Sequence, residues 1–190
     1  MLIEQIVLVR HGKPAWKPGR WIAGAELAGW SAGRDAAPLD PAFPPRSALL
    51  ALSRRSATIA ASPLRRSIES AQMLRPATPP LIDEHFREVP TPGDIGSGIR
   101  LRADVWVGIA RLRWRLGWSA GVETLEESRR RAATAALRLE ALALEHGSVL
   151  LAGHGIMNGM IGRCLRQAGW RGPVFRGRRY WAFRVFRKER

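Results

Sequence analysis

Three short motifs in the sequence carry residue types suited to phosphoryl transfer. They are Arg10-His11-Gly12 near the start, Ser62–Arg66 (SPLRR) in the middle and Gly153-His154-Gly155 near the end. A neutral imidazole can attack phosphorus, and a guanidinium offers a planar set of donors that matches phosphate oxygens. Two imidazoles and two guanidiniums around one crevice would hold a tetrahedral dianion and spread the charge of an in-line transfer.

The segments before these motifs predict the strands that would bring them together. Residues 6–9, 57–61 and 148–152 are short runs of apolar or small side chains. Such runs are typical of strands that are covered on both faces of a parallel sheet. Ligands in open α/β sheets bind at the carboxyl ends of strands, where all three motifs fall. We therefore expect one shared crevice, in which Gly12 lets the backbone come close to a ligand.

Two helix starts are marked by their capping residues. Ser62 and Pro63 predict one, because serine caps free amides and proline suits the first helical position. Arg65 and Arg66 would then lie in the first turn, where the helix dipole favours anions. Thr124–Glu127 matches a capping box and opens a long helix that we expect to end at Gly147.

The remaining segments complete an alternation of strands and helices. Further helices are predicted at 46–54, 99–116 and 156–168, and further strands at 81–82 and 180–186. In the helix at 99–116 we expect one apolar face, with the tryptophans packed at an edge rather than exposed beside its arginines; that face consists of Leu101, Val105, Ile109, Leu112 and Leu116.

Residues 13–45 predict a long loop, because they are rich in Pro, Gly and Trp and show little periodicity. Short helical turns are expected around residues 25–33. The alternation along the rest of the chain predicts an α/β fold, a three-layer α/β/α sandwich with a mainly parallel central sheet. No repeat or linker divides the sequence, so we expect one domain over residues 1–190.

Composition sets broad limits on partners. The net charge is +15, from 31 Lys and Arg against 16 Asp and Glu, which favours anionic partners. The basic residues are spread along the chain, so charge alone does not identify the partner. The single cysteine, Cys164, excludes an internal disulfide and a Cys-based zinc site, and we expect it in a packed core. No stretch approaches the roughly 20 apolar residues needed to span a bilayer, and we expect a cytoplasmic protein with no membrane partner.

Taken together, Leu8–Gly12, Ser62–Ala71 and Val149–Gly155 form a pattern that resembles the histidine phosphatase superfamily, also called the phosphoglycerate-mutase-like family. The resemblance covers most of the chain and implies the phosphoglycerate-mutase-like fold. Ser70 replaces the usual Thr of the second motif, which is a mild departure.

The resemblance also implies roles for individual residues. His11 would take the phosphoryl group and form a phosphohistidine. Arg10 and Arg66 would bind the phosphate, and His154 would donate to the phosphoryl oxygens during transfer. Since a leaving alkoxide needs a proton, an acid should sit at the crevice mouth.

Glu88 best fits the position of this acid, because the family commonly supplies a glutamate from the loop between the second motif and the next helix. Glu84 and Asp94 are rivals, and a solvated surface carboxylate is the alternative. The sequence departs from the family pattern at Lys13-Pro14, where many members have Glu-Thr, and the loop lacks the Gly-x-Trp-Glu-Gly stretch typical of mutases. The chain is also shorter than typical glycolytic mutases, which favours a phosphatase.

The sequence therefore predicts a metal-independent phosphomonoesterase that acts on a small phosphorylated substrate and needs no cofactor. The motifs also allow a phosphohistidine-protein phosphatase or a phosphoglycerate-type mutase that uses the same pocket. A third hypothesis is a non-catalytic module that binds an anionic polymer through its arginines. It leaves the placement of both histidines unexplained, and no nucleic-acid partner is expected. The substrate's identity and the oligomeric state do not follow from the sequence.

Overall fold

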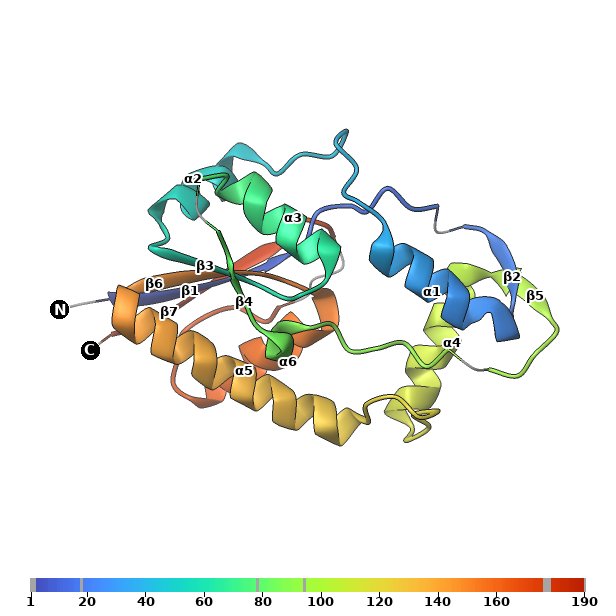
Figure 1. Cartoon of the computed structure of the whole chain (residues 1–190). Helices are drawn as coiled ribbons and strands as arrows, with labels where there is room; N and C mark the ends of the chain where they lie inside the picture. Colours follow the sequence, from blue (N-terminus) through green and yellow to red (C-terminus); the bar gives the residue numbers. More distant parts are fainter. Residues whose placement is uncertain (1–2, 18, 78, 94, 176–178, 190) are drawn as a thin grey trace.

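A mixed sheet of five strands forms the centre of the protein (Figure 1). The structure is a computed structural model that describes residues 3–17, 19–77, 79–93, 95–175 and 179–189. The strand order is β4 (Leu81–Ile82), β3 (Thr58–Ala61), β6 (Ser148–Gly153), β1 (Ile3–Arg10) and β7 (Phe183–Glu189). The paired strands run parallel except β7, which is antiparallel to β1. The predicted α/β class and mainly parallel sheet are confirmed.

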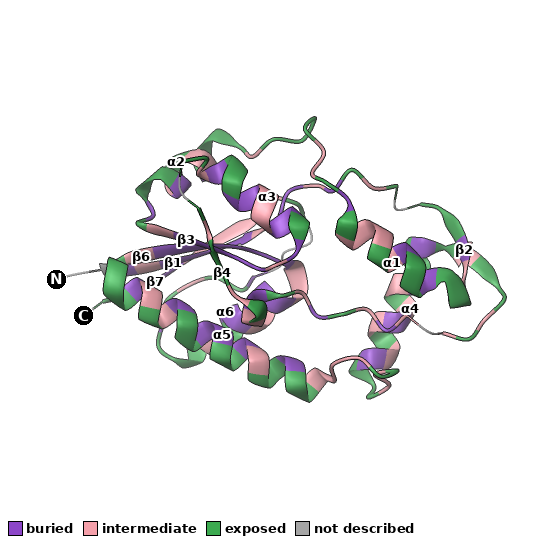
Figure 2. Ribbon diagram, in the orientation of Figure 1, coloured by how far each residue is buried: buried purple, intermediate pink, exposed green. Residues whose placement is uncertain are grey.

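Helices cover both faces of this sheet (Figures 1 and 2). On one side lie α2 (Ser47–Arg55) and α3 (Arg65–Leu74), and on the other α5 (Leu125–His146) and α6 (Gly155–Gln167). Side chains of β1 alternate between the two cores: Ile6 and Leu8 pack with α5 and α6, and Val7 and Val9 pack with α2 and α3. All four are fully buried, as expected for a strand without a polar face.

A smaller lobe lies beyond the carboxyl edge of the sheet, at the right of Figure 1. It contains a two-stranded antiparallel ribbon of β2 (Trp21–Ala23) and β5 (Arg100–Arg102), the 3-10 turn η1 (Gly24–Glu26), and the helices α1 (Leu27–Ala36) and α4 (Ala103–Arg115). The segment 13–45 is therefore more regular than predicted, with a ten-residue helix and a strand in place of a loop with short turns. Trp16 and Trp30 stabilise this lobe, packing edge to face with ring centroids 6.0 Å apart.

The predicted apolar face of the helix at 99–116 is wrong at Val105, Leu112 and Leu116, which are exposed, whereas Leu101 and Ile109 are partly buried against the core of the smaller lobe. The helix begins at Ala103, after β5, and buries Ala103, Trp106, Ala110 and Trp114 instead. Leu112 and Leu116 are 58% and 79% exposed. The two faces have nearly the same helical spacing. The face with the alanines and indoles is the buried one, because the alanines allow close approach to the lobe and the indoles bury more apolar area. The expectation that Trp106 and Trp114 are packed is confirmed.

Local signals placed some element ends correctly and others not. Thr124 and Glu127 form the predicted capping box, and α5 ends at Gly147, which has a φ of 80°. The predicted start of α3 is wrong: the helix begins at Arg65, preceded by Leu64, which provides no side-chain cap. Ser62 does not cap the helix, because its hydroxyl contacts the ring of His154, which follows β6. The last strand begins at Phe183 rather than at residue 180. Among the described helices, none is long and apolar enough to cross a membrane.

Candidate active site

The register of the parallel strands brings the sequence motifs to one edge. Arg10 is paired with Gly153, and Ala61 is paired with Ala152. The next residues, His11, Ser62 and His154, therefore emerge side by side. The N–H of His11 donates to the carbonyl of Gly153 over 2.9 Å, and the rings of His11 and His154 have centroids 5.1 Å apart. The expected convergence of the motifs at the carboxyl ends is confirmed.

His11 is held as a neutral imidazole with one ring nitrogen available as an acceptor. Its side chain is 5% exposed, and Nδ1 lies 2.7 Å from the carbonyl oxygen of Gly12. Burial, followed by the charge of Arg66, lowers the pKa of His11 well below 6.5. In the neutral ring Nδ1 donates to that carbonyl, so Nε2 carries the lone pair, and Nε of Arg66 donates to it over 3.2 Å.

Arg66 is a buried cation with partners on two sides. It lies in the first turn of α3 and is 3% exposed. Besides its contact with His11, its Nη1 donates to Oδ1 of Asp35 over 2.7 Å. Burial lowers the pKa of Arg66 and the neighbouring Asp35 opposes that change. Asp35 comes from α1 in the smaller lobe, and nothing in the sequence around it marked it as part of the site.

Arg10 lies at the end of β1, with its guanidinium 4.5 Å from the centroid of the Tyr180 ring. Burial lowers the pKa of Arg10, while Tyr180 and Glu88 act in the opposite direction. The Tyr180 ring also lies 5.7 Å from the ring of His11. The sequence predicts Tyr180 at the start of the last strand, but in the structure it precedes β7 and lines the pocket.

His154 lies fully buried beside His11, with Nε2 2.6 Å from Oγ of Ser62. Oγ of Ser62 accepts from the N–H of Leu64 over 3.3 Å, so its own proton is free to be donated to Nε2. Burial, followed by His11, lowers the pKa of His154 well below 6.5, which keeps the ring neutral. In this arrangement the ring proton is on Nδ1, which is buried and has no hydrogen-bond partner in the described chain.

Buried polar side chains fix the helices to these strand ends. The N–H of Gly12 donates to Oγ of Ser70 over 2.9 Å, and Nδ2 of Asn158 donates to the carbonyl of Val9 over 2.9 Å. A Cβ at Gly12 would lie 2.4 Å from the indole of Trp181. The close approach that glycine permits at this position is therefore to Trp181, a contact that the sequence did not predict.

Glu88 lies in the loop that follows the 3-10 turn η2 (Glu84–Phe86) and is tied to the start of α6. Its carboxylate accepts from the N–H groups of Ile156 and Met157 over 3.2 and 3.0 Å. Arg111 of α4 holds the same loop by donating to the carbonyls of Val89 and Pro90. Burial lowers the pKa of Arg111 to about 10, with Glu88 acting against it.

The rival acids are placed differently. Glu84 has a side chain that is 70% exposed and pairs with Arg87, and it does not line the pocket in the described chain. Asp94 lies outside the described residues. Of the two glutamates, the structure places only Glu88 at the pocket that His11 lines.

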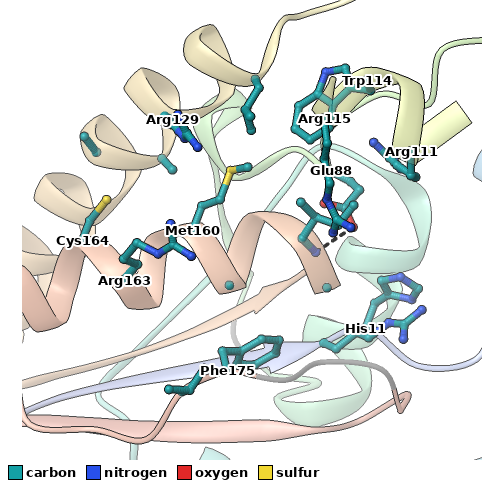
Figure 3. Close-up of a pocket in the computed structure, with 18 of the residues that line it drawn as sticks. His11, Glu88, Arg111, Trp114, Arg115, Arg129, Met160, Arg163, Cys164 and Phe175 are labelled. Atoms are coloured by element: carbon teal, nitrogen blue, oxygen red, sulfur yellow. Dashed lines mark hydrogen bonds between the residues drawn. The ribbon is translucent and has the colours of Figure 1, made fainter. Parts of the chain in front are cut away.

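A pocket of about 1650 Å³ opens over His11 (Figure 3). Among the described residues that line it are eight arginines and a single carboxylate, that of Glu88; the arginines are Arg10, Arg34, Arg66, Arg111, Arg115, Arg129, Arg163 and Arg166. Such an excess of positive charge in a concave site attracts anions. His154 does not line the pocket. Among the described residues, no cluster of three or more His, Cys, Asp or Glu is arranged to hold a metal ion.

Cys164 lies on α6 toward the far end of the same pocket and is partly buried against the core. Burial raises the pKa of its thiol, so the thiol is protonated at neutral pH. The expectation of a packed thiol is confirmed in part, since one side of Cys164 faces the pocket.

Replacing Ser62 by alanine tests whether its hydroxyl sets the tautomer of His154. Loss of a neutral hydrogen bond changes the free energy by about 0.5–1.5 kcal/mol, so we expect kcat for a phosphate monoester to fall roughly 3- to 10-fold. KM should change little, because Ser62 does not line the pocket in the described chain. The control is Ser56→Ala, another buried serine, whose hydroxyl bonds to the carbonyl of Leu52 away from the site. Equal kcat values for the two variants would contradict the role of Ser62.

Comparisons with known proteins agree with this geometry. The family model described as the histidine phosphatase superfamily (branch 1) matches residues 6–174. A search of curated proteins gives no match. Among solved structures, a mycobacterial glucosyl-3-phosphoglycerate phosphatase in complex with VO3 is similar, with a TM-score of 0.62 and 21% identity over 96% of this chain and 92% of that one.

Two further solved structures are similar. A mycobacterial hydrolase has a TM-score of 0.63 and 20% identity, over 98% of this chain and 83% of that chain. A phosphoserine phosphatase mutant from Entamoeba histolytica, in complex with phosphoserine, has a TM-score of 0.58 and 13% identity, over 95% of this chain and 89% of that chain. At these identities the likeness shows a shared fold.

Proposed function

The chain belongs to the histidine phosphatase superfamily (branch 1) and is a phosphoric monoester hydrolase. We propose that it transfers the phosphoryl group of a small substrate to His11 and then to water, without a metal ion. The observation that carries the proposal is the state of the His11 ring. It is neutral, its Nδ1 is bonded to the Gly12 carbonyl, and its Nε2 lone pair faces the guanidinium of Arg66.

In the first step the lone pair of Nε2 on His11 forms a bond to phosphorus. The bond from phosphorus to the ester oxygen breaks, and its electron pair stays on that oxygen, which takes a proton from the carboxyl group of Glu88. Arg66 moves its Nε–H from Nε2 to a phosphoryl oxygen, and Arg10 binds another. These cations stabilise the charge on the equatorial oxygens during transfer.

In the second step a water molecule attacks the phosphohistidine. Glu88, now a carboxylate, takes a proton from the water, and the bond from nitrogen to phosphorus breaks to return the lone pair to His11. Inorganic phosphate leaves. His154 would donate a hydrogen bond from its Nδ1–H to a phosphoryl oxygen and keep its proton. Because its ring has no exposed surface, this contact requires His11 or Arg66 to shift when the phosphoryl group enters.

The substrate class is proposed from the pocket and from the similar structures. A pocket with one carboxylate among eight arginines in the described lining fits a phosphorylated small molecule. The similar structures include phosphatases named for glucosyl-3-phosphoglycerate and for phosphoserine. A screen of phosphorylated metabolites for phosphate release, with and without a chelator, tests the proposal. Exchange of phosphate between two positions of one metabolite without net release would instead indicate a mutase.

Replacing Glu88 by glutamine should harm substrates according to their leaving groups. An alkyl phosphate needs a proton on the departing oxygen, so we expect its kcat/KM to fall roughly 100-fold, whereas p-nitrophenyl phosphate should lose far less. Glu84→Gln is the control, since Glu84 is an exposed glutamate in the same segment. Because glutamine would set an NH₂ group against the α6 amides, Glu88→Ala should be measured as well. Equal losses on both substrates in both variants would contradict the acid role.

The lowered pKa of His11 predicts its behaviour in acid. A buried imidazole whose pKa lies below the usual 6.5 stays neutral as the pH falls through 6.5 and takes its proton only at a lower pH. The His11 ring signals in an NMR titration of the free enzyme should therefore show a midpoint below 6.5, with assignment by the His11→Ala variant. A midpoint at or above 6.5 would contradict a nucleophile that is neutral through burial.

A further inference from the structure

The pocket extends well beyond the groups that would react. It follows α6 from its first turn, where Glu88 binds the N–H of Ile156, toward its middle (Figure 3). Arg163 lies seven residues after Ile156, which is about 10 Å along a helix that rises 1.5 Å per residue. Figure 3 shows Arg163 of α6 and Arg129 of α5 at the opposite end of the pocket from His11. A second cationic region therefore lies far from the reacting phosphate.

The arginines of this region have no acidic partners. Within the described chain, the side chains of Arg129 and Arg163 make no hydrogen bond or ion pair, and Nη1 of Arg166 is buried without a partner. The next two arginines of α5 differ, because Arg130 pairs with Glu126 and Arg131 with Glu123. Guanidinium groups that share one cleft repel one another, and a bound anion would remove that repulsion.

Along α6, the wall between the two cationic ends is apolar. The residues of this helix that line the pocket before Arg163 are Gly155, Ile156, Gly159 and Met160, and Leu125 of α5 and Trp114 of α4 add apolar side chains to the lining. A chain with charge all along its length would have to place anions over these side chains, which would remove water from the anions without giving them a partner. A ligand with an anionic group at each end and an apolar segment between them avoids that loss.

We propose that Arg129 and Arg163, together with Arg166, form a second anion-binding subsite that selects phosphomonoesters carrying another anionic group at the far end of an apolar segment. The proposal rests on the proposed function, because the other end of the ligand is the ester that His11 attacks. The subsite sets which substrates bind and takes no part in the transfer itself.

The test compares octanediol bisphosphate with octyl phosphate as substrates. The wild-type protein should have a kcat/KM roughly 10-fold or more higher for the bisphosphate at low salt, since a hydrogen bond to a charged group contributes on the order of tenfold in affinity. In the double variant Arg129→Ala/Arg163→Ala this ratio should fall to about the statistical factor of the two equivalent ends. Using the ratio cancels any loss that both substrates share at the reacting end.

The matched control is Arg54→Ala/Arg55→Ala, which removes two exposed arginines from the end of α2, on the other face of the sheet. It should keep the preference for the bisphosphate. Equal losses in the two double variants would show only long-range attraction and would overturn the subsite. So would an unchanged ratio in the Arg129→Ala/Arg163→Ala variant.

Binding without turnover separates this proposal from the proposed function. Calorimetric titration of the wild-type protein and of the Arg129→Ala/Arg163→Ala variant with octanediol bisphosphate, in the presence of a chelator, should show about tenfold weaker binding in the variant. If no ester is hydrolysed but this difference is found, the proposed function fails and the subsite stands. If linear polyphosphate binds more tightly than the bisphosphate through the same arginines, the claim that the ligand has an apolar segment between its anionic groups is wrong.

Discussion

Replacing His11 by alanine is expected to lower kcat for p-nitrophenyl phosphate by roughly 10⁴-fold or more, because the variant lacks the nitrogen that we propose attacks phosphorus. In the structure Nε2 of His11 is the ring nitrogen without a proton, and its lone pair accepts a hydrogen bond from Arg66, which keeps it facing the cationic side of the site. Hydrolysis should be measured with a chelator present, so that a contaminating metal-dependent phosphatase does not mask the loss.

The control for this variant is His146→Ala, which removes an exposed histidine at the end of α5. Its activity should equal that of the wild-type protein. A second readout is the phosphohistidine, which should appear as an acid-labile added phosphoryl group in rapidly quenched wild-type enzyme and be missing from His11→Ala. Circular dichroism and thermal unfolding check that the variant folds. Metal-free activity that survives in His11→Ala would end the proposed mechanism.

Replacing Arg66 by alanine should lower kcat/KM by roughly 10³-fold. Its buried guanidinium contacts Nε2 of His11, the proposed nucleophile, and removal of a single donor to a developing charge has effects of about 10²- to 10³-fold. The variant also removes the nearer partner of Asp35, whose carboxylate keeps only the longer contact of 3.6 Å with Arg34, so its charge would repel a phosphate dianion. Arg66→Lys should recover part of the loss, because it restores the charge without the planar set of donors.

Arg65→Ala is the matched control for Arg66. Arg65 is the adjacent residue of α3, but its side chain is exposed and pairs with Glu69. We expect little change in its kcat/KM. The charge of Arg66 also contributes to lowering the pKa of His11, so in Arg66→Ala the NMR midpoint of His11 should move up, although burial still holds it below the usual value. Similar activity losses in Arg65→Ala and Arg66→Ala would mean that only net charge matters.

For Glu88, the sequence predicted the residue but not its contacts. Its position in the loop after the second motif could be proposed from the sequence, but its hydrogen bonds to the first amides of α6 depend on a helix that starts about 70 residues later. Arg111 likewise reaches the loop from α4 and bonds to its carbonyls. The sequence identified the residue type, and the packing of distant elements determined what it contacts.

At the start of α3 and on the buried face of α4, predictions from neighbouring residues were wrong. The capping preference of a serine contributes on the order of 1 kcal/mol, so a buried partner such as His154 can outweigh it, and α3 begins two residues later than predicted, at Arg65. In α4 two faces of similar spacing competed, and the sequence does not say which one meets the smaller lobe. The side with alanines and indoles is buried because that lobe offers it a surface to fill.

The sequence by itself determined the strands of the sheet, the long helix α5, the placement of Arg10, His11, Ser62 and His154 at strand ends, and that of Arg66 in the first turn of a helix. Uninterrupted apolar runs and capping boxes act over a few residues, so they can be recognised without the fold. Only the tertiary structure decided that Asp35 pairs with Arg66, that Ser62 contacts His154, and that Arg129 and Arg163 lie in the pocket of His11. These contacts join residues from different elements, and the packing of helices on the sheet sets which of them meet.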